Sequence, residues 1–196
     1  STRVKHAYLL MLIAVSIFLR FTYLDFIEFK GDEFRALEMA IELIHGSVPL
    51  HGLKSSTGLH NPPIFIYLLS IPVLVSTNPI FVTLFVIILI FFCLWLLYQF
   101  IRTYFSSSMA LWTTALFASM PWAIIYSRKI WAQDLLFPFL MLFYITFFSM
   151  LKDYKPWKLY SSFLLLAIIT QLHMSAWFLP IPLCLALCFI KRQWKW

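Results

Sequence analysis

A series of long, almost uncharged stretches most constrains how this chain can fold. Seven apolar runs lie along its 196 residues, near 6–27, 63–75, 80–101, 108–126, 135–151, 159–177 and 178–190. A membrane-crossing helix needs roughly 20 apolar residues, and most of these runs approach that length. Only 12% of the residues are charged, whereas a soluble domain has about 25%. We therefore predict an all-α fold, a polytopic transmembrane helical bundle.

The run at 63–75 is short, and its proline-rich borders favour a helix that enters the membrane without crossing it. The distribution of basic residues supports this interpretation. If 63–75 does not cross and the N-terminus is cytoplasmic, nine Lys and Arg residues lie on the cytoplasmic side and five on the outer side. Cytoplasmic loops normally carry this excess, and the bias disappears or reverses if 63–75 crosses. We predict about six crossings, both termini cytoplasmic, and a surface helix and a dipping helix in the first outer loop.

The acidic residues and the cysteines limit the function further. Seven of the eight acids fall on or near the predicted outer side, and only Asp153 is cytoplasmic. The net charge of +7 comes from basic residues that flank apolar spans, so we expect contacts with membrane lipids and no nucleic acid partner. Cys93, Cys184 and Cys188 lie inside apolar runs, where we expect neither a disulfide nor a thiolate metal site.

The first outer loop contains a predicted amphipathic helix over residues 33–45. Its apolar stripe is Phe34, Leu37, Ile41 and Ile44, with Arg35, Glu38 and Glu42 on the opposite face. Gly46 fits the position at which a helix stops. Asp32, directly before this helix, has two compatible interpretations: a helix cap and a catalytic carboxylate.

The second outer loop, "YSRKIWAQDLL" at 126–136, brings Arg128, Lys129 and Asp134 to the same membrane face. One interpretation is an interfacial loop anchored by Tyr126 and Trp131. The other is a site, because a carboxylate can act as a general base and an Arg or Lys can bind a phosphate. Asp32 and Arg128 would then act at one interface.

At this point the chain resembles the integral-membrane glycosyltransferases of the GT-C class, in the protein mannosyltransferase and aminoarabinose transferase branch. The matching segments occur in the same order, and they are "FLRFTYLDF", "GDE", "HNPPIFIYLL", "SRKIWAQDLL" and "LLLAIITQLHMSAWFLPIP". The resemblance implies transfer of a sugar from a polyprenyl-phosphate donor to a lipid, glycan or protein acceptor. It also implies an integral protein of a prokaryotic-type plasma membrane with its active site facing outward.

The resemblance also assigns roles to residues. Asp32 acts as the base, assisted by Glu33. Arg128 and Asp134 carry the second-loop functions, with Arg128 holding the donor phosphate, Lys129 beside it and Asp134 in the substrate cavity. Family members are longer, the chain starts without Met, and it stops after "KRQWKW". We therefore expect residues 1–196 to form one module, with further C-terminal spans and any outer domain missing.

Four further residues are weaker candidates. Arg20, inside the first run, either binds the donor phosphate or extends towards the surface. His173, with Gln171 nearby, either faces the substrate cavity or packs through a hydrogen bond, and His60 and Asn61 are expected to line the same cavity. We expect no required cofactor. A divalent ion held by Asp32, Asp134 and His60 is the alternative, although no tight ligand spacing supports it.

Two other functions fit an apolar bundle. A transporter or channel subunit could use the dipping helix as a pore element, but such proteins place charges near the bilayer midplane and often contain repeats, and this chain shows neither. A non-catalytic membrane scaffold could retain the same module without activity. The retained "GDE" and "SRKIWAQD" segments favour an enzyme over both.

Overall fold

The computed structural model describes residues 2–55, 58–181 and 184, and over these residues the protein is all-α. No β-strand occurs in that part of the chain; an isolated bridge joins Lys54 and His60. The elements in order are α1 (Thr2–Phe21), η1 (Leu24–Phe26), α2 (Gly31–Ile44), α3 (Ile64–Val73), α4 (Pro79–Tyr104), α5 (Ser107–Ser119), α6 (Pro121–Tyr126), α7 (Ala132–Lys152), α8 (Pro156–Leu172) and η2 (Met174–Phe178).

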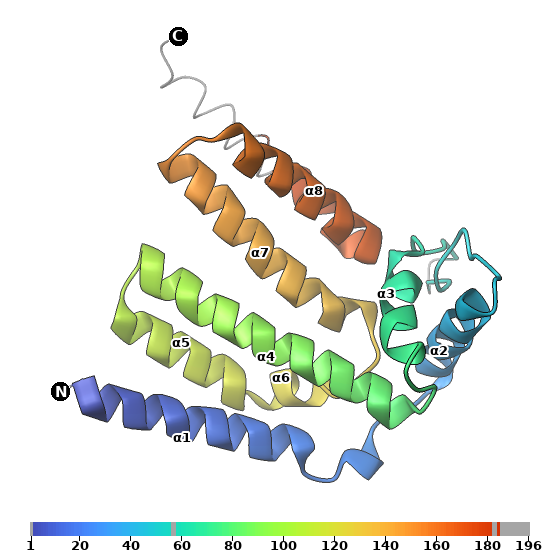
Figure 1. Ribbon diagram of the computed structural model, residues 1–196, viewed down its shortest axis with the longest axis horizontal. Coiled ribbons are helices and arrows are strands. Elements are labelled where there is room, and N and C mark those ends of the chain that lie inside the picture. Colours follow the sequence, from blue (N-terminus) through green and yellow to red (C-terminus); the bar gives the residue numbers. More distant parts are fainter. Residues whose placement is uncertain (1, 56–57, 182–183, 185–196) are drawn as a thin grey trace.

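Five helices lie side by side, and α2 and α3 cover one end of the row (Figure 1). The order across the row is α1, α5, α4, α7 and α8, and each packs against the next. The start of α1 and the α4–α5 and α7–α8 turns lie at one end (Figure 1). The end of α1, the starts of α4 and α7 and the end of α8 lie at the other, next to α2 and α3.

Among the described residues, two helices are long and apolar enough to cross a membrane by themselves: α4 and α7. The apolar part of α1, Leu10–Phe21, and α3 are shorter. The all-α prediction is confirmed, but the predicted number of about six crossings is not. Most of the predicted run at 178–190 lies outside the described residues, and so does Cys188. Cys93 is free and buried, and Cys184 is free and exposed.

The predicted span at 108–126 does not form one continuous helix, because the helix breaks at Met120. The helix α5 ends at Ser119 and α6 begins at Pro121, with Met120 in an extended conformation (φ −62°, ψ 125°). A proline disfavours helical backbone in the residue before it and has no N–H to donate. The break turns α6 towards α1, which it contacts.

The helices α2 and α3 form a pair at the end of the bundle, and α3 also contacts α4 and α8. Gly46 has φ +98°, so the prediction that it ends α2 is confirmed. The helix α3 has 10 residues and is about 15 Å long at 1.5 Å per residue, which is too short to cross a membrane.

The predicted apolar stripe of α2 is only partly correct. Its buried side consists of Glu33, Ala36, Leu37 and Ala40, while Phe34 is 56% exposed. Small alanines allow α2 to lie close to α3, and the larger Phe34 turns outward against Phe29. The predicted polar face holds, since Arg35 forms ion pairs with Glu38 and Glu42 on the exposed side.

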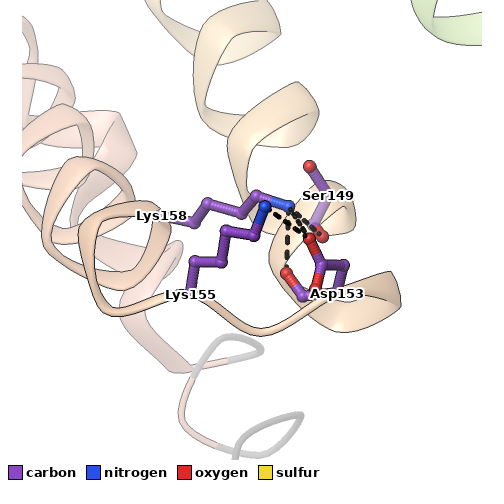
Figure 2. Close-up of polar contacts among 4 residues, drawn as sticks. All are labelled: Ser149, Asp153, Lys155 and Lys158. Carbon is purple, nitrogen blue, oxygen red and sulfur yellow. Dashed lines mark hydrogen bonds and ion pairs between the residues drawn. The ribbon is translucent and has the colours of Figure 1, made fainter.

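A buried lysine joins α7 to α8 at the opposite end of the bundle (Figure 2). Lys158 is 7% exposed, and its Nζ donates to the Ser149 carbonyl (3.2 Å), the Asp153 carbonyl (2.9 Å) and the Asp153 carboxylate (3.2 Å). The last carbonyls of a helix lack partners within the helix. Lys158 therefore satisfies the end of α7 from the first turn of α8, and Lys155 adds an exposed pair with Asp153.

Candidate functional site

A cleft of about 250 Å³ lies where the loop before α3 meets the start of α2, the start of α7 and the end of α8. It has both polar and apolar walls. Three residues predicted from the sequence share it: Asp32, Asn61 and His173. The other lining residues are Leu53, Lys54, Ser55, Pro62, Phe65, Trp131, Ala132, Gln133 and Leu172.

Asp32 is exposed and faces this cleft from the first turn of α2. The helix begins at Gly31, two residues earlier than predicted, so Asp32 lies inside the helix and is not its cap. No hydrogen bond or ion pair engages its carboxylate among the described residues. This carboxylate is therefore available to accept a proton from a molecule in the cleft.

Glu33, the other member of the acidic pair, has a different position. It is 1% exposed, and its Oε2 accepts a hydrogen bond of 3.1 Å from the Lys30 backbone N–H. Glu33 thus performs the capping that the sequence suggested for Asp32. Glu33 does not line the cleft that Asp32 faces. The structure therefore gives no support to its predicted role of assisting Asp32.

Residues 53–55 and 61–62, which precede α3, form one wall of the cleft. The backbone N–H and the side-chain Nδ2 of Asn61 both donate to the Leu53 carbonyl, at 2.9 and 3.1 Å, and Gly52 N–H donates to the Asn61 carbonyl at 2.7 Å. A Cβ at Gly52 would lie 2.5 Å from the Pro62 carbonyl oxygen, so this close approach requires glycine. His60 does not line the cleft; it is exposed and its ring lies 5.6 Å from that of His51.

His173 closes the cleft from the end of α8. Its Nδ1 accepts a hydrogen bond of 3.2 Å from Ser175 N–H, and its Nε2 lies 3.1 Å from the side-chain nitrogen of Gln133. Burial lowers the pKa of His173 below its ordinary value of 6.5, which favours the neutral ring. Gln133 was missed from the sequence, whereas Gln171 is exposed and lies outside the cleft lining.

The two adjacent basic residues of the second loop have opposite environments. Lys129 is buried, forms an ion pair with Glu28 and lies over the rings of Trp131 (4.6 Å) and Tyr126 (5.4 Å). The Lys129 hydrogen bond lowers the pKa of Glu28, and Lys30 adds to the effect. Arg128 has no acidic partner among the described residues. One of its terminal nitrogens donates to the Tyr23 carbonyl, and its Nε is unpaired.

Arg20 does not extend to the surface, contrary to one of its two interpretations. It is fully buried, and its Nη1 donates to the Ser16 hydroxyl (2.7 Å) and to the Ala118 carbonyl (2.8 Å). Its Nε and Nη2 have no partner within the described structure. Ser16 and Ala118 also line an almost entirely apolar cavity of about 200 Å³ between α1, α4 and α5.

Asp134 is also buried and is not part of the cleft lining. Its Oδ2 has no hydrogen-bond partner in the described part of the chain. The suggested metal site of Asp32, Asp134 and His60 does not form. Within residues 2–55, 58–181 and 184, no three His, Cys, Asp or Glu side chains come close enough to hold a metal ion.

Comparison with known proteins matches the sequence model of the family described as dolichyl-phosphate-mannose-protein mannosyltransferase to residues 60–196. The match includes Asn61, Arg128 and His173, and it begins after Asp32 and Glu33. Searches of the curated proteins and of the solved structures gave no significant match.

The family match covers more than two thirds of the chain, and it agrees with the apolar helices and with the resemblance seen in the sequence. Proteins of this family are integral to the membrane and transfer a sugar from a polyprenyl-phosphate donor. The chain belongs to the dolichyl-phosphate-mannose-protein mannosyltransferase family, a branch of the GT-C glycosyltransferases.

Proposed function

We propose that this protein transfers a sugar from a polyprenyl-phosphate donor to a hydroxyl-bearing acceptor at the outer face of the membrane, with Asp32 as the general base. The observation that carries the proposal is the Asp32 carboxylate, which faces the cleft and has no partner among the described residues. The acceptor oxygen attacks the anomeric carbon and its proton passes to Asp32. The bond between that carbon and the phosphate oxygen breaks, and the polyprenyl phosphate leaves with the electron pair.

The leaving phosphate needs a cation. Neither Arg128 nor Lys129 lines the cleft itself, but Arg128 is the more available of the two for this role. Lys129 is already paired with Glu28, so binding a second anion would weaken that buried contact. Arg128 has no carboxylate partner in the described structure, and its guanidinium can bind two phosphate oxygens at once. Arg20 is a second candidate, because two of its buried nitrogens are unpaired.

The outward orientation is part of the same proposal. The cleft, α2 and α3 lie at one end of the bundle, and the basic α7–α8 turn lies at the other (Figure 1). The positive-inside rule assigns the basic end to the cytoplasm. Five crossings result among the described residues if α1, α4, α5 with α6, α7 and α8 each span a plasma membrane, with α3 dipping in from outside. The sixth predicted run, at 178–190, lies mostly outside those residues.

The donor can be tested by a binding assay with a polyprenyl-phosphate sugar on the protein in lipid nanodiscs. We expect Arg128→Ala to weaken binding much more than Lys129→Ala, and Arg128→Lys to restore it only in part, because an ammonium cannot form the forked contact. No detectable binding by the wild type would refute the proposed activity and would favour a transporter or a scaffold. Equal binding by wild type and Arg128→Ala would refute only the role of Arg128.

A further inference from the structure

A chain of polar side chains crosses the base of the cleft and includes a residue that the proposed reaction does not yet use. Gln133 projects from the first turn of α7 and meets His173 at the end of α8, and His173 in turn contacts Ser175. Asp32 faces the same cleft from α2. The amide of Gln133 therefore lies in the same cleft as the Asp32 carboxylate and contacts the residue that directly follows α8.

The contacts of His173 determine which atoms Gln133 can offer to a ligand. Ser175 N–H donates to Nδ1, so the neutral ring has its proton on Nε2, which faces Gln133. When the Gln133 amide is rotated about its Cγ–Cδ bond, its oxygen accepts a hydrogen bond from this N–H. Its NH₂ group is then directed away from His173. An amide has two N–H donors, so this group can donate to a ligand while its oxygen remains engaged.

Other walls of the cleft fit a sugar. Trp131 and Pro62 offer flat apolar surfaces, and the C–H face of a pyranose packs well on such surfaces. The Oδ1 of Asn61 is buried and has no partner in the described structure, so it can accept a hydrogen bond from a hydroxyl. The cleft therefore combines a donor, an acceptor and apolar walls, which is what recognition of a sugar ring needs.

We propose that Gln133 is a specificity-determining residue that donates a hydrogen bond to one hydroxyl of the transferred sugar, with His173 and Ser175 holding its amide in place. This inference rests on the proposed function. We assign the hydroxyl to the donor sugar and not to the acceptor, because Trp131 and Gln133 line the cleft and belong to the same short segment as Arg128, the residue proposed to bind the donor phosphate. A donor phosphate at Arg128 would bring the sugar attached to it towards Trp131 and Gln133.

The test measures which hydroxyl each variant recognises. The protein in lipid nanodiscs is first titrated with polyprenyl-phosphate mannose, glucose, galactose and arabinose. The sugar that binds most tightly is then compared with its monodeoxy analogues. We expect the wild type to bind one analogue roughly tenfold to hundredfold more weakly than the parent, because the analogue leaves a polar group of the site unpaired. In Gln133→Ala this difference should nearly vanish for that analogue.

The controls separate recognition from folding and from the proposed function. Gln171→Ala removes an exposed glutamine outside the cleft and should keep the wild-type ratio. Ser175→Ala should reduce the ratio in part, since it removes the hydroxyl contact to His173 but not the backbone one.

A Gln133→Ala variant that keeps the full wild-type ratio overturns the inference, and so does a wild type that distinguishes no analogue. If Gln133→Ala changes the KM for the acceptor and leaves the donor ratio intact, Gln133 acts in acceptor binding and the inference is also overturned. Failure of the wild type to bind any of the four donors refutes the proposed function itself.

Discussion

Asp32 and Glu33 are adjacent acids with opposite surroundings, so neutralising each in turn should separate catalysis from folding. Asp32→Asn keeps the shape of the side chain and removes its negative charge. Loss of a general base costs about 10²–10⁴-fold in rate, which is about 3–5 kcal/mol in the activation free energy. The folded state should lose at most about 1 kcal/mol, the usual limit for an exposed charge at a helix start, because no partner of Asp32 is lost.

Glu33→Gln is the matched control. Glu33 is buried and accepts a hydrogen bond from Lys30 N–H, and an amide oxygen can still accept that bond. Since Glu33 does not line the cleft, we expect this variant to retain most of the transfer. Replacing it with alanine instead should destabilise the protein by about 0.5–2 kcal/mol, as the loss of a helix cap does.

Transfer is measured as the release of labelled polyprenyl phosphate from the sugar-charged lipid in membranes. The free energy of unfolding is compared through thermal or denaturant unfolding in detergent. Equal loss of transfer in Asp32→Asn and Glu33→Gln would refute the argument from cleft exposure. Unchanged transfer in Asp32→Asn would mean that this residue interacts with the dipole of α2 but is not the base. A large loss of stability would mean that Asp32 makes a contact that is absent from the structure.

Three further predictions concern the ends of the bundle. Lys158→Met should lower the free energy of unfolding by about 1–3 kcal/mol, because carbonyls at the end of α7 lose a charged hydrogen-bond donor. Lys155→Met removes only an exposed ion pair and should have almost no effect. Because burial lowers the pKa of His173 in the folded state, the unfolded state binds more protons, and stability should fall as pH drops below about 6.5. Unfolding midpoints between pH 7.5 and 5 test this, and His173→Asn, which can still accept from Ser175 N–H, should flatten the dependence. A cysteine that replaces Ala132 should be labelled from outside the cell, and one that replaces Tyr154 should not. Labelling at position 154 from outside would contradict the predicted orientation.

The helical, membrane-type character of the chain could be predicted from the sequence, because it depends on local properties. Long apolar runs with few charges fold as helices wherever they pack. The stop at Gly46 and the shortness of α3 follow from single residues and from length in the same way. The break at Met120 was missed although Pro121 is visible in the sequence, because a proline in an apolar run can either kink a helix or end it.

Three of the site residues predicted from the sequence lie together in the structure. Asp32 was proposed as the base, Asn61 and His173 were proposed for the cavity, and all three line one cleft. His60 and Asp134 were proposed for it as well, yet one is exposed beside His51 and the other is buried. Position along the chain identifies the loop that carries a residue, but it does not say which way that residue's side chain points.

Only the tertiary structure distinguished neighbours of like chemistry. Asp32 faces the cleft while Glu33 caps its own helix, and Arg128 lacks an acidic partner in the described structure while Lys129 is paired with Glu28. The role proposed for Gln133 depends on the end of α8, which places His173 beside it. Such assignments depend on contacts between segments far apart in the chain, and a charge is free or engaged only with respect to what the fold places next to it.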